Sequence, residues 1–192
     1  MVIGITGNSG TGKSEIAKLL AKKINAKIIN ADLVAKKLSE PGKIYNEKII
    51  NLFGKEISEN GIINRKKLAN LVYNNSEKRE KLNLLTYIYV GNEIKQEVEK
   101  SEYKNVIIDA PLLFESGLDK ICNYTIAIVA ENDIKKERIC KRDNIEENTA
   151  KARLSIQPDD EYYEKRANHI IKNNGKIEEI KLEEICTIIG TN

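Results

Sequence analysis

The chain has 192 residues, with 32 Lys and Arg against 29 Asp and Glu, one His, three Cys and no Trp. This length predicts one domain with room for a modest insertion, and it suffices for a core without disulfide or metal staples. The formal net charge of +3, with both signs interspersed, argues against a protein that wraps nucleic acid. No apolar run approaches the ~18 residues of a membrane helix, and the first residues do not resemble a secretory signal. We therefore expect a soluble, cytoplasmic protein with no membrane or nucleic-acid partner.

The cysteines and the histidine carry little chemical signal. Cys122, Cys140 and Cys186 are odd in number and widely spaced, which favours ordinary buried or half-buried thiols over a disulfide framework. A zinc site of the usual kind would have to combine His169 with these scattered thiols, so we expect no such site and give His169 a structural role.

Short apolar segments alternate with stretches of helical periodicity along most of the chain. Residues 2–6 predict a first strand, residues 16–24 a helix, and residues 26–29 a second strand. Three further strands and a closing helix are expected at 105–109, 124–130, 169–171 and 177–189. Strands that alternate with helices predict an α/β fold with a mostly parallel, doubly wound sheet covered on both faces.

Two stretches depart from this alternation. Residues 33–103 show helical patterns without a clear strand, and we expect a helical insertion there. It would form one wall of the substrate site, because ligands of open α/β sheets bind at the carboxyl ends of the strands. A second polar, helical stretch, at about 138–166, is placed to close over that site as a lid. The remaining core is expected at 1–32 and 104–192.

The strongest chemical motif is GNSGTGKS at residues 7–14, which fits G-x-x-x-x-G-K-[ST]. It follows a predicted strand and opens a predicted helix, as this motif requires. Glycines let backbone N–H groups converge on phosphate oxygens, and the helix N-terminus adds partial positive charge. We therefore expect a phosphate-binding loop for a nucleoside triphosphate, in which Lys13 contacts phosphate and the Ser14 hydroxyl binds Mg²⁺.

Asp109 ends a run of apolar residues, which is where nucleotide-binding proteins place a carboxylate that holds Mg²⁺ or its water shell. A strand can also end in a capping Asp that has no such role. Ala110 stands where many motor ATPases have a Glu that activates water, and the GTPase patterns D-x-x-G and N-K-x-D are missing. The residues therefore indicate a phosphotransferase rather than a nucleotide hydrolase.

Three more side chains are candidates for the transfer step. Asp32 follows the second strand, where a carboxylate can orient an acceptor hydroxyl and take its proton; the alternative is that it caps a helix starting near Leu33. Arg138 and Arg142 lie one helical turn apart, so both guanidinium groups project from one helix face. Such a pair can neutralise phosphate charge and exclude water, although solvated arginines on helices are common.

At this point the residues resemble those of the dephospho-coenzyme A kinase family, from about Val2 to Gly175. The most specific segment is DAPLLFE at residues 109–115, which matches the family's D-x-P-L-L-F-E. NADLVA at residues 30–35 is similar to its D-A-D-x-V-A. Segments that resemble the family's insertion, its lid motifs and its V-I-x-N-x-G ending are found at 40–42, 61–68, 138–143, 153–157, 165–167 and 170–175.

Three positions depart from the family pattern. Asn30 replaces the first Asp, which reduces the charge near the acceptor. LLTYI at residues 84–88 replaces the usual L-x-H-P region, so a His-Pro pair is absent. Asn168 replaces an Asp, a change that we expect to be structural. None of the three removes the phosphate-binding residues.

The resemblance implies a P-loop kinase fold with a nucleotide-binding core, a helical substrate-binding insertion and a helical lid. It implies transfer of the γ-phosphoryl group of ATP to the ribose 3′-hydroxyl of dephospho-coenzyme A, the last step of coenzyme A biosynthesis, with ATP and Mg²⁺ as cofactors. Lys13 and Arg138 would stabilise charge on the transferring group, Asp32 would be the base, and Ser14 with Asp109 would hold Mg²⁺. The nucleotide-binding residues implied are Gly10, Thr11, Gly12, Lys13, Ser14, Glu15, Arg142, Asn174 and Gly175.

Two other functions remain open at this stage. One is another P-loop small-molecule kinase, such as a nucleoside monophosphate kinase, against which the segment at 109–115 argues. The other is a non-catalytic module that senses ATP and changes a partner surface. The residues do not determine the oligomeric state.

Overall fold

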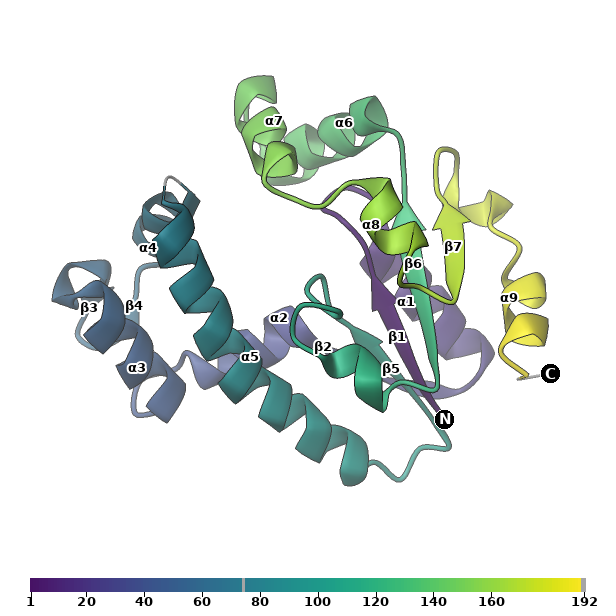
Figure 1. Ribbon diagram of the computed structural model, residues 1–192, viewed down its shortest axis with the longest axis horizontal. Helices are drawn as coiled ribbons and strands as arrows, with labels where there is room; N and C mark the ends of the chain where they lie inside the picture. The colour runs from purple at the N-terminus through teal and green to yellow at the C-terminus, as the bar shows by residue number, and fades with distance from the viewer. Residues whose placement is uncertain (74, 191–192) are drawn as a thin grey trace. The chain divides into compact units, whose positions relative to one another are not determined.

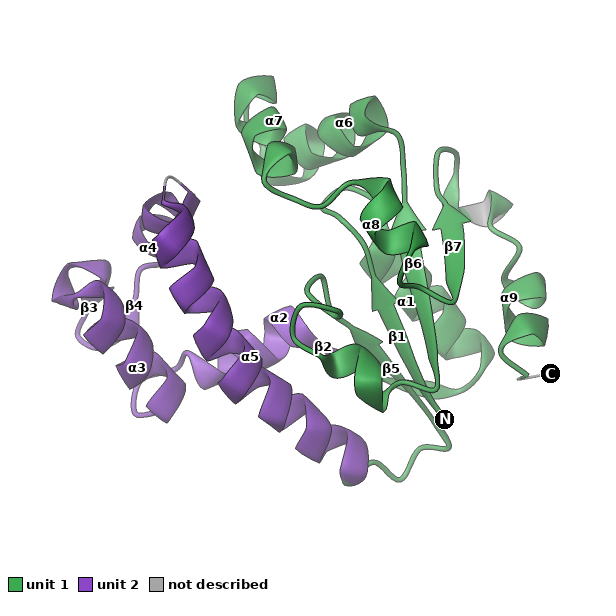
Figure 2. Ribbon diagram, in the orientation of Figure 1, with its two compact units in different colours: residues 1–29, 100–192 green, residues 30–99 purple. Residues whose placement is uncertain are grey.

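The structure is a computed structural model that describes residues 1–73 and 75–190. Residues 74, 191 and 192, which the expected core and insertion include, lie outside the described residues. The chain divides into two compact units, one of Met1–Ile29 with Lys100–Asn192 and one of Asn30–Glu99 (Figure 2). The insertion expected from sequence begins and ends a few residues later than the second unit.

The first unit is built on a five-stranded sheet with the strand order β2-β5-β1-β6-β7 (Figure 1). Its strands are β1 (Val2–Thr6), β2 (Ala26–Asn30), β5 (Asn105–Asp109), β6 (Tyr124–Val129) and β7 (His169–Lys172). β1 pairs in parallel with β5 and β6, and β6 pairs in parallel with β7. The apolar runs predicted all five strands, and the mostly parallel sheet is confirmed.

Helices cover both faces of this sheet. The helices that pack on it are α1 (Lys13–Lys23), α8 (Asp160–Glu164) and α9 (Leu182–Ile188). Ile126 and Ile128 of β6 belong to one core cluster with residues of α1 and α9. Ala127 and Val129 contact Tyr163 of α8 instead. Because successive side chains of a strand point to opposite faces, this division shows a sheet buried on both sides, which confirms the doubly wound fold.

The polar region between β6 and β7 begins earlier than expected and consists of three helices. Two residues separate β6 from α6 (Asn132–Asp143), and α7 (Glu147–Ser155) and α8 follow. The closing helix is shorter than predicted. A 3-10 turn (Ile177–Glu179) precedes α9, and the two are separated because Ile180 adopts an extended backbone conformation with φ −76° and ψ 120°.

The second unit consists mainly of helices. They are α2 (Ala31–Leu38), α3 (Ile44–Phe53), α4 (Arg65–Tyr73) and the long α5 (Ser76–Glu99), with a 3-10 turn at Lys55–Ile57. α5 contacts each of the other three helices. The absence of strands predicted for this region is wrong in one detail, because β3 (Ser58–Glu59) and β4 (Ile62–Ile63) form an antiparallel hairpin. Asn60 and Gly61 make its turn with φ of 51° and 76°, the conformation that an Asn-Gly pair favours.

Among residues 1–73 and 75–190, no helix combines the length and the apolar character that crossing a membrane requires. Cys122 and Cys140 are half-buried and Cys186 is buried in the core, as expected for ordinary packing residues.

Candidate active site

The loop between β1 and α1 has the backbone of a phosphate-binding loop. Gly10 and Gly12 have φ of 81° and 82°, in the left-handed region that other residues rarely adopt. A Cβ atom on Gly10 would also collide with the backbone of Lys135 in α6. Gly12 precedes α1, and no described side chain caps that helix. The first N–H groups of α1 and its partial positive charge are therefore available for an anion.

Asp109 joins the two motif side chains Lys13 and Ser14. Its Oδ1 accepts a hydrogen bond from Lys13 Nζ at 2.8 Å, and its Oδ2 accepts one from Ser14 Oγ at 2.7 Å. The parallel register of β1 and β5 sets Asp109 opposite Ile5, at the end where the loop begins. The side chain of Asp109 is 2% exposed and that of Lys13 is 11% exposed, so the two charges compensate each other away from water.

The donor atoms in this cluster suit Mg²⁺ rather than a metal held by protein alone. Mg²⁺ takes oxygen ligands and usually binds one or two protein groups together with phosphate oxygens and water. Ser14 and Asp109 offer a hydroxyl and a carboxylate within hydrogen-bonding distance of each other. Over residues 1–73 and 75–190, no group of three or more His, Cys, Asp or Glu side chains is arranged to hold a metal ion.

Arg138 of α6 links the phosphate loop to the segment after β7. Its guanidinium donates to the carbonyl oxygens of Asn173 at 3.0 Å, Gly175 at 3.0 Å and Gly10 at 3.4 Å. The sequence-based assignment set Arg142 near this segment and Arg138 near the transferring phosphate. In the described contacts, Arg138 is the arginine that touches both the loop and the segment after β7.

Arg142 lies at the end of α6 and forms a different contact. It donates to both carboxylate oxygens of Asp143, at 2.8 and 3.0 Å, and Arg153 of α7 donates to the same carboxylate at 2.5 Å. The hydrogen bond from Arg142 holds the pKa of Asp143 below its usual value, against the opposing effect of partial burial. The arginine pair one turn apart therefore has two separate sets of partners.

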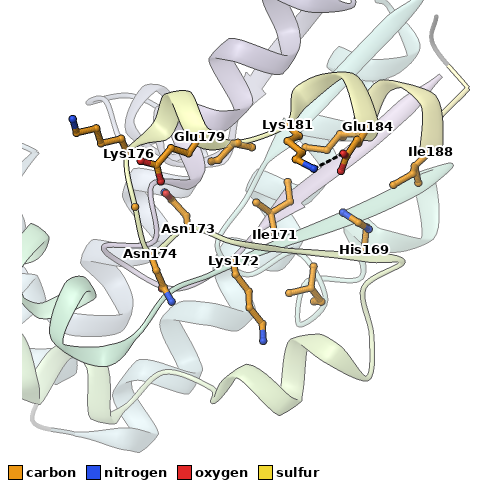
Figure 3. A pocket seen from close by; sticks show the side chains of 14 residues that line it. His169, Ile171, Lys172, Asn173, Asn174, Lys176, Glu179, Lys181, Glu184 and Ile188 are labelled. Carbon is orange, nitrogen blue, oxygen red and sulfur yellow. Dashed lines mark hydrogen bonds and ion pairs between the residues drawn. The ribbon is translucent and has the colours of Figure 1, made fainter.

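The segment after β7 borders a cavity of about 440 Å³ that extends to α9 (Figure 3). Asn173 is buried, and its Nδ2 donates to the carbonyl oxygen of Thr11 at 2.8 Å. Asn174 Oδ1 accepts from the backbone N–H of Glu131 at 2.9 Å, and its Nδ2 donates to Glu131 Oε1 at 2.8 Å. Hydrogen bonds thus join this segment to the phosphate loop and to the start of α6.

The two remaining loop residues of the predicted nucleotide site differ in burial. Thr11 is buried, and its Oγ1 donates to the carbonyl oxygen of Asn8 at 2.9 Å. Glu15 is exposed on the first turn of α1. The side chain of Thr11 therefore supports the loop from within, and its backbone is the part that faces a ligand in a loop of this kind.

Asp32 lies in the second unit, in the first turn of α2, and is exposed. The residue that caps this helix is Asn30, whose Oδ1 accepts from the backbone N–H of Leu33 at 3.0 Å. The alternative that Asp32 caps a helix starting near Leu33 is therefore wrong, because α2 begins at Ala31. The capping position also explains the departure at Asn30, since Asp and Asn cap helices about equally well.

The other two departures from the family pattern have structural partners. Asn168 Oδ1 accepts from the backbone N–H and the hydroxyl of Thr125, at 2.8 and 2.9 Å, which ties the residue before β7 to β6. In the segment without the His-Pro pair, the hydroxyl of Thr86 on α5 lies 2.9 Å from the hydroxyl of Tyr45 on α3. Both are contacts within one unit, and both hold packed elements together.

Sequence reasoning assigned no role to a set of polar contacts on the phosphate loop. Asn8 is hydrogen-bonded to Pro158 and Ser9 to Gln157, two residues that connect α7 to α8. Asn8 is also hydrogen-bonded to Tyr163 of α8. The one signal in the sequence was that Gln157 falls in a segment resembling the family's lid motif. The partners are about 150 residues apart, so no local pattern joins them.

A parallel sheet of this order, with a phosphate-binding loop after its central strand and a lysine, serine and aspartate cluster at its carboxyl edge, defines a P-loop kinase. The family model described as dephospho-CoA kinase matches residues 1–179. The chain belongs to the dephospho-CoA kinase family.

Individual relatives agree with this assignment. A dephospho-CoA kinase of Fusobacterium nucleatum is 40% identical over 192 residues, which cover 98% of each chain. The solved dephospho-CoA kinase of Campylobacter jejuni is 29% identical with a TM-score of 0.63, over 98% of this chain and 94% of that one. A crystal structure from Thermus thermophilus is 26% identical with a TM-score of 0.82, over 100% of this chain and 98% of that one. The family and the fold predicted from the sequence are confirmed.

Proposed function

We propose that this protein transfers the γ-phosphoryl group of ATP to the ribose 3′-hydroxyl of dephospho-coenzyme A and releases coenzyme A and ADP, the last step of coenzyme A biosynthesis. The observation that carries the proposal is the Lys13–Asp109–Ser14 cluster at the mouth of the phosphate loop, in a chain of this family. Phosphoryl transfer needs little covalent chemistry from a protein, so positioning and charge stabilisation are the main tasks of the site.

Lys13 and the loop provide the positive side of the site. The backbone N–H groups from Gly10 to Glu15 surround the triphosphate, and the Lys13 ammonium moves from Asp109 to the phosphate oxygens. Ser14 and Asp109 would hold Mg²⁺ directly or through water, and the ion would supply positive charge that neutralises the phosphates. Because Asp109 is nearly buried, its negative charge stays compensated only if an ion takes the place of the lysine.

Arg138 and Asn173 form the nucleotide side of the site. The Arg138 guanidinium bonds to three neutral carbonyl oxygens, and a phosphate oxygen offers it a stronger, charge-assisted partner. We assign Arg138 to charge stabilisation on the transferring group. The segment with Asn174 and Gly175, together with Arg142, takes the adenosine part of ATP. Asn173 Oδ1 is buried and has no partner among the described residues, so it can accept a hydrogen bond on this side.

Asp32 is the proposed base for the acceptor hydroxyl. Asp32 is exposed on the first turn of α2, and it does not cap this helix because Asn30 does. A carboxylate placed beside an acceptor hydroxyl can orient it and take its proton as the phosphoryl group is transferred.

The helical unit is the proposed binding region for the acceptor. It contains a cavity of about 280 Å³ lined mostly by apolar side chains, among them Ile49, Leu68, Ala69 and Val72, with Arg65 also on the lining. An apolar cavity with few polar groups suits an aliphatic arm that carries amides, such as pantetheine. We also propose that the reaction takes place in the cytoplasm and involves neither nucleic acid nor a membrane.

One assay tests the function. Protein, Mg-ATP and dephospho-coenzyme A are incubated, and mass spectrometry detects a product heavier by one phosphate, with Lys13→Ala as the inactive control. Parallel reactions contain AMP, CMP or no acceptor. Product with a nucleoside monophosphate alone would identify another small-molecule kinase, and ATP binding without any product would identify a sensing module.

A further inference from the structure

The side of the phosphate loop formed by Asn8 and Ser9 is hydrogen-bonded to the connection between α7 and α8. Asn8 Nδ2 donates to the carbonyl oxygen of Pro158 at 2.7 Å. Gln157 forms two hydrogen bonds with Ser9. Its Oε1 accepts from the Ser9 backbone N–H at 3.0 Å, and its Nε2 donates to Ser9 Oγ at 3.3 Å. Two successive loop residues are thus held by two successive residues from the far end of the chain.

Asn8 has a second partner in the buried interior. The Tyr163 hydroxyl donates to Asn8 Oδ1 at 2.7 Å, and Tyr163 and Asn8 are 2% and 8% exposed. Burial raises the pKa of the Tyr163 hydroxyl, so this group stays protonated near neutral pH and can donate its hydrogen bond to Asn8. A carboxamide is the side-chain group that accepts at one end and donates at the other, and Asn8 uses both ends here.

We propose that Asn8 and Gln157 are positioning residues for phosphoryl transfer, which fix the backbone of the phosphate loop to the α7–α8 connection. We call these contacts of Asn8, Ser9, Gln157, Pro158 and Tyr163 the loop clamp. The inference rests on the proposed function, because positioning has a meaning only for a transfer step. The clamped residues come directly before Gly10, where the phosphate-facing part of the loop starts, so a shift at Ser9 moves every N–H group that follows.

Side-chain packing alone would not hold the phosphate loop in position without the loop clamp. A cavity of about 470 Å³ lies beside it, lined by Asn8 and Gln157 among others. Lys135 and Asp160 also line this cavity, and their atoms Nζ and Oδ1 are 3.6 Å apart. With open space on one side, the position of the loop depends on directional hydrogen bonds rather than on filled volume. Losing one of them leaves a half-buried N–H or carbonyl unpaired and lets the loop move.

The expected signature is a loss of turnover without a loss of ATP binding. The loop clamp touches neither Lys13 nor Ser14, so the ground-state contacts to phosphate survive its removal. Transfer demands closer alignment than binding does, and misplacement of reacting groups by about 1 Å can lower the rate by on the order of 10². A clamp variant should therefore lower kcat at a nearly constant KM for ATP.

The experiment compares two clamp variants with two matched controls. Gln157→Ala and Tyr163→Phe remove clamp hydrogen bonds, and Tyr163→Phe deletes a single oxygen, so it folds even if Gln157→Ala does not. The controls are Gln96→Ala, an exposed glutamine of α5, and Tyr124→Phe, a half-buried tyrosine of β6 outside the loop clamp. We expect kcat to fall about tenfold in each clamp variant, with KM for ATP within about twofold and both controls unchanged.

A second measurement separates this inference from the proposed function. Amide hydrogen exchange at Ser9, with a non-hydrolysable ATP analogue bound, should be about tenfold faster in Gln157→Ala than in the wild type, whether or not dephospho-coenzyme A is the acceptor. If the wild type transfers phosphate and the clamp variants lose melting temperature but keep kcat, the contacts are structural and the inference is overturned. It is equally overturned if KM for ATP rises tenfold at constant kcat, or if Ser9 exchange does not change.

Discussion

The two units of this protein differ in how fully their side chains are buried. In the first unit, the strands carry isoleucines with no exposed surface, such as Ile3, Ile5 and Ile107, and helices pack on both faces. In the second unit, α4 buries no residue and the long α5 buries only Val90, Gly91 and Ile94. The sheet of the phosphate-binding unit is therefore densely packed, whereas α4 and α5 of the proposed acceptor unit have fewer packing contacts that would oppose a change of conformation.

The exposed apolar side chains support the same contrast. Leu33, Ile44 and Ile62, all in the second unit, are 66%, 60% and 61% exposed. The cavity of the same unit, lined by residues of α3 and α4 among others, is the proposed site of an apolar ligand arm.

The largest effect is expected at Lys13. Lys13→Ala should lower kcat by about 10²–10³-fold, because a preorganised charge at the transferring phosphate is lost. It should also lower the melting temperature, since Asp109 keeps its buried charge without the ammonium. Lys18→Ala, an exposed lysine on the same helix, is the matched control and should leave both unchanged. Wild-type turnover in folded Lys13→Ala protein would contradict the proposed phosphate site.

Asp32 and Asn30 should separate chemistry from stability within the second unit. Asp32→Asn should lower kcat about 10²-fold with little change in ATP affinity or melting temperature, because it removes a base and leaves the helix cap intact. Asn30→Ala should instead cost about 1 kcal/mol of unfolding free energy, because Leu33 N–H loses its acceptor. Urea titrations and steady-state kinetics on both variants measure the two effects. The reverse pattern would return Asp32 to a structural role.

Filling the cavity of the second unit should affect only the acceptor. Ala69→Phe puts a ring into the space between α3 and α4 and should raise KM for dephospho-coenzyme A about tenfold, with KM for ATP unchanged. Ala152→Phe, on exposed α7 of the first unit, is the control. An Ala69→Phe enzyme with wild-type KM for both substrates would place the pantetheine arm elsewhere.

The smallest effect concerns acid stability of the first unit. Arg142, and then Arg153, lower the pKa of Asp143 in the folded state. The ionised Asp143 therefore stabilises the folded state fully above the unfolded-state pKa near 3.8. This stabilisation is lost as pH falls through the lower pKa of the folded state. Thermal melts between about pH 5 and 2 should therefore show a shallower loss in Asp143→Asn than in the wild type. Identical slopes would mean that the arginines do not stabilise this carboxylate in solution.

Most of the first unit could be predicted from the sequence because its signals are local. Apolar runs of five or six residues are strands in a sheet buried on both faces, and the glycine motif places Lys13 and Ser14 by spacing alone. Asp109 could be placed because a parallel neighbour strand ends at the same edge.

The features that sequence analysis missed depend on long-range contacts or on very short elements. The partners of Arg138 are 35 to 128 residues away, so helical periodicity could show its face but not what it touches. The strands β3 and β4 have two residues each, too few for an alternating pattern, although the Asn60-Gly61 pair marked their turn. The alternative that made Asp32 the cap of α2 is two residues away from the actual cap, Asn30, because both residues have the right side chain for it.

The sheet order has a consequence for how the chain folds as it is made. β1 has β5 and β6 as its neighbours, with Val2 opposite Val106, and β2 is also placed beside β5. β1 therefore lacks a neighbour until more than one hundred residues have followed it from the ribosome. Residues 30–99, by contrast, are contiguous and emerge whole before β5 does. During synthesis the phosphate loop leaves the ribosome long before the strands that flank β1, and it reaches its final form late, because closing such distant pairs is the slow step of folding.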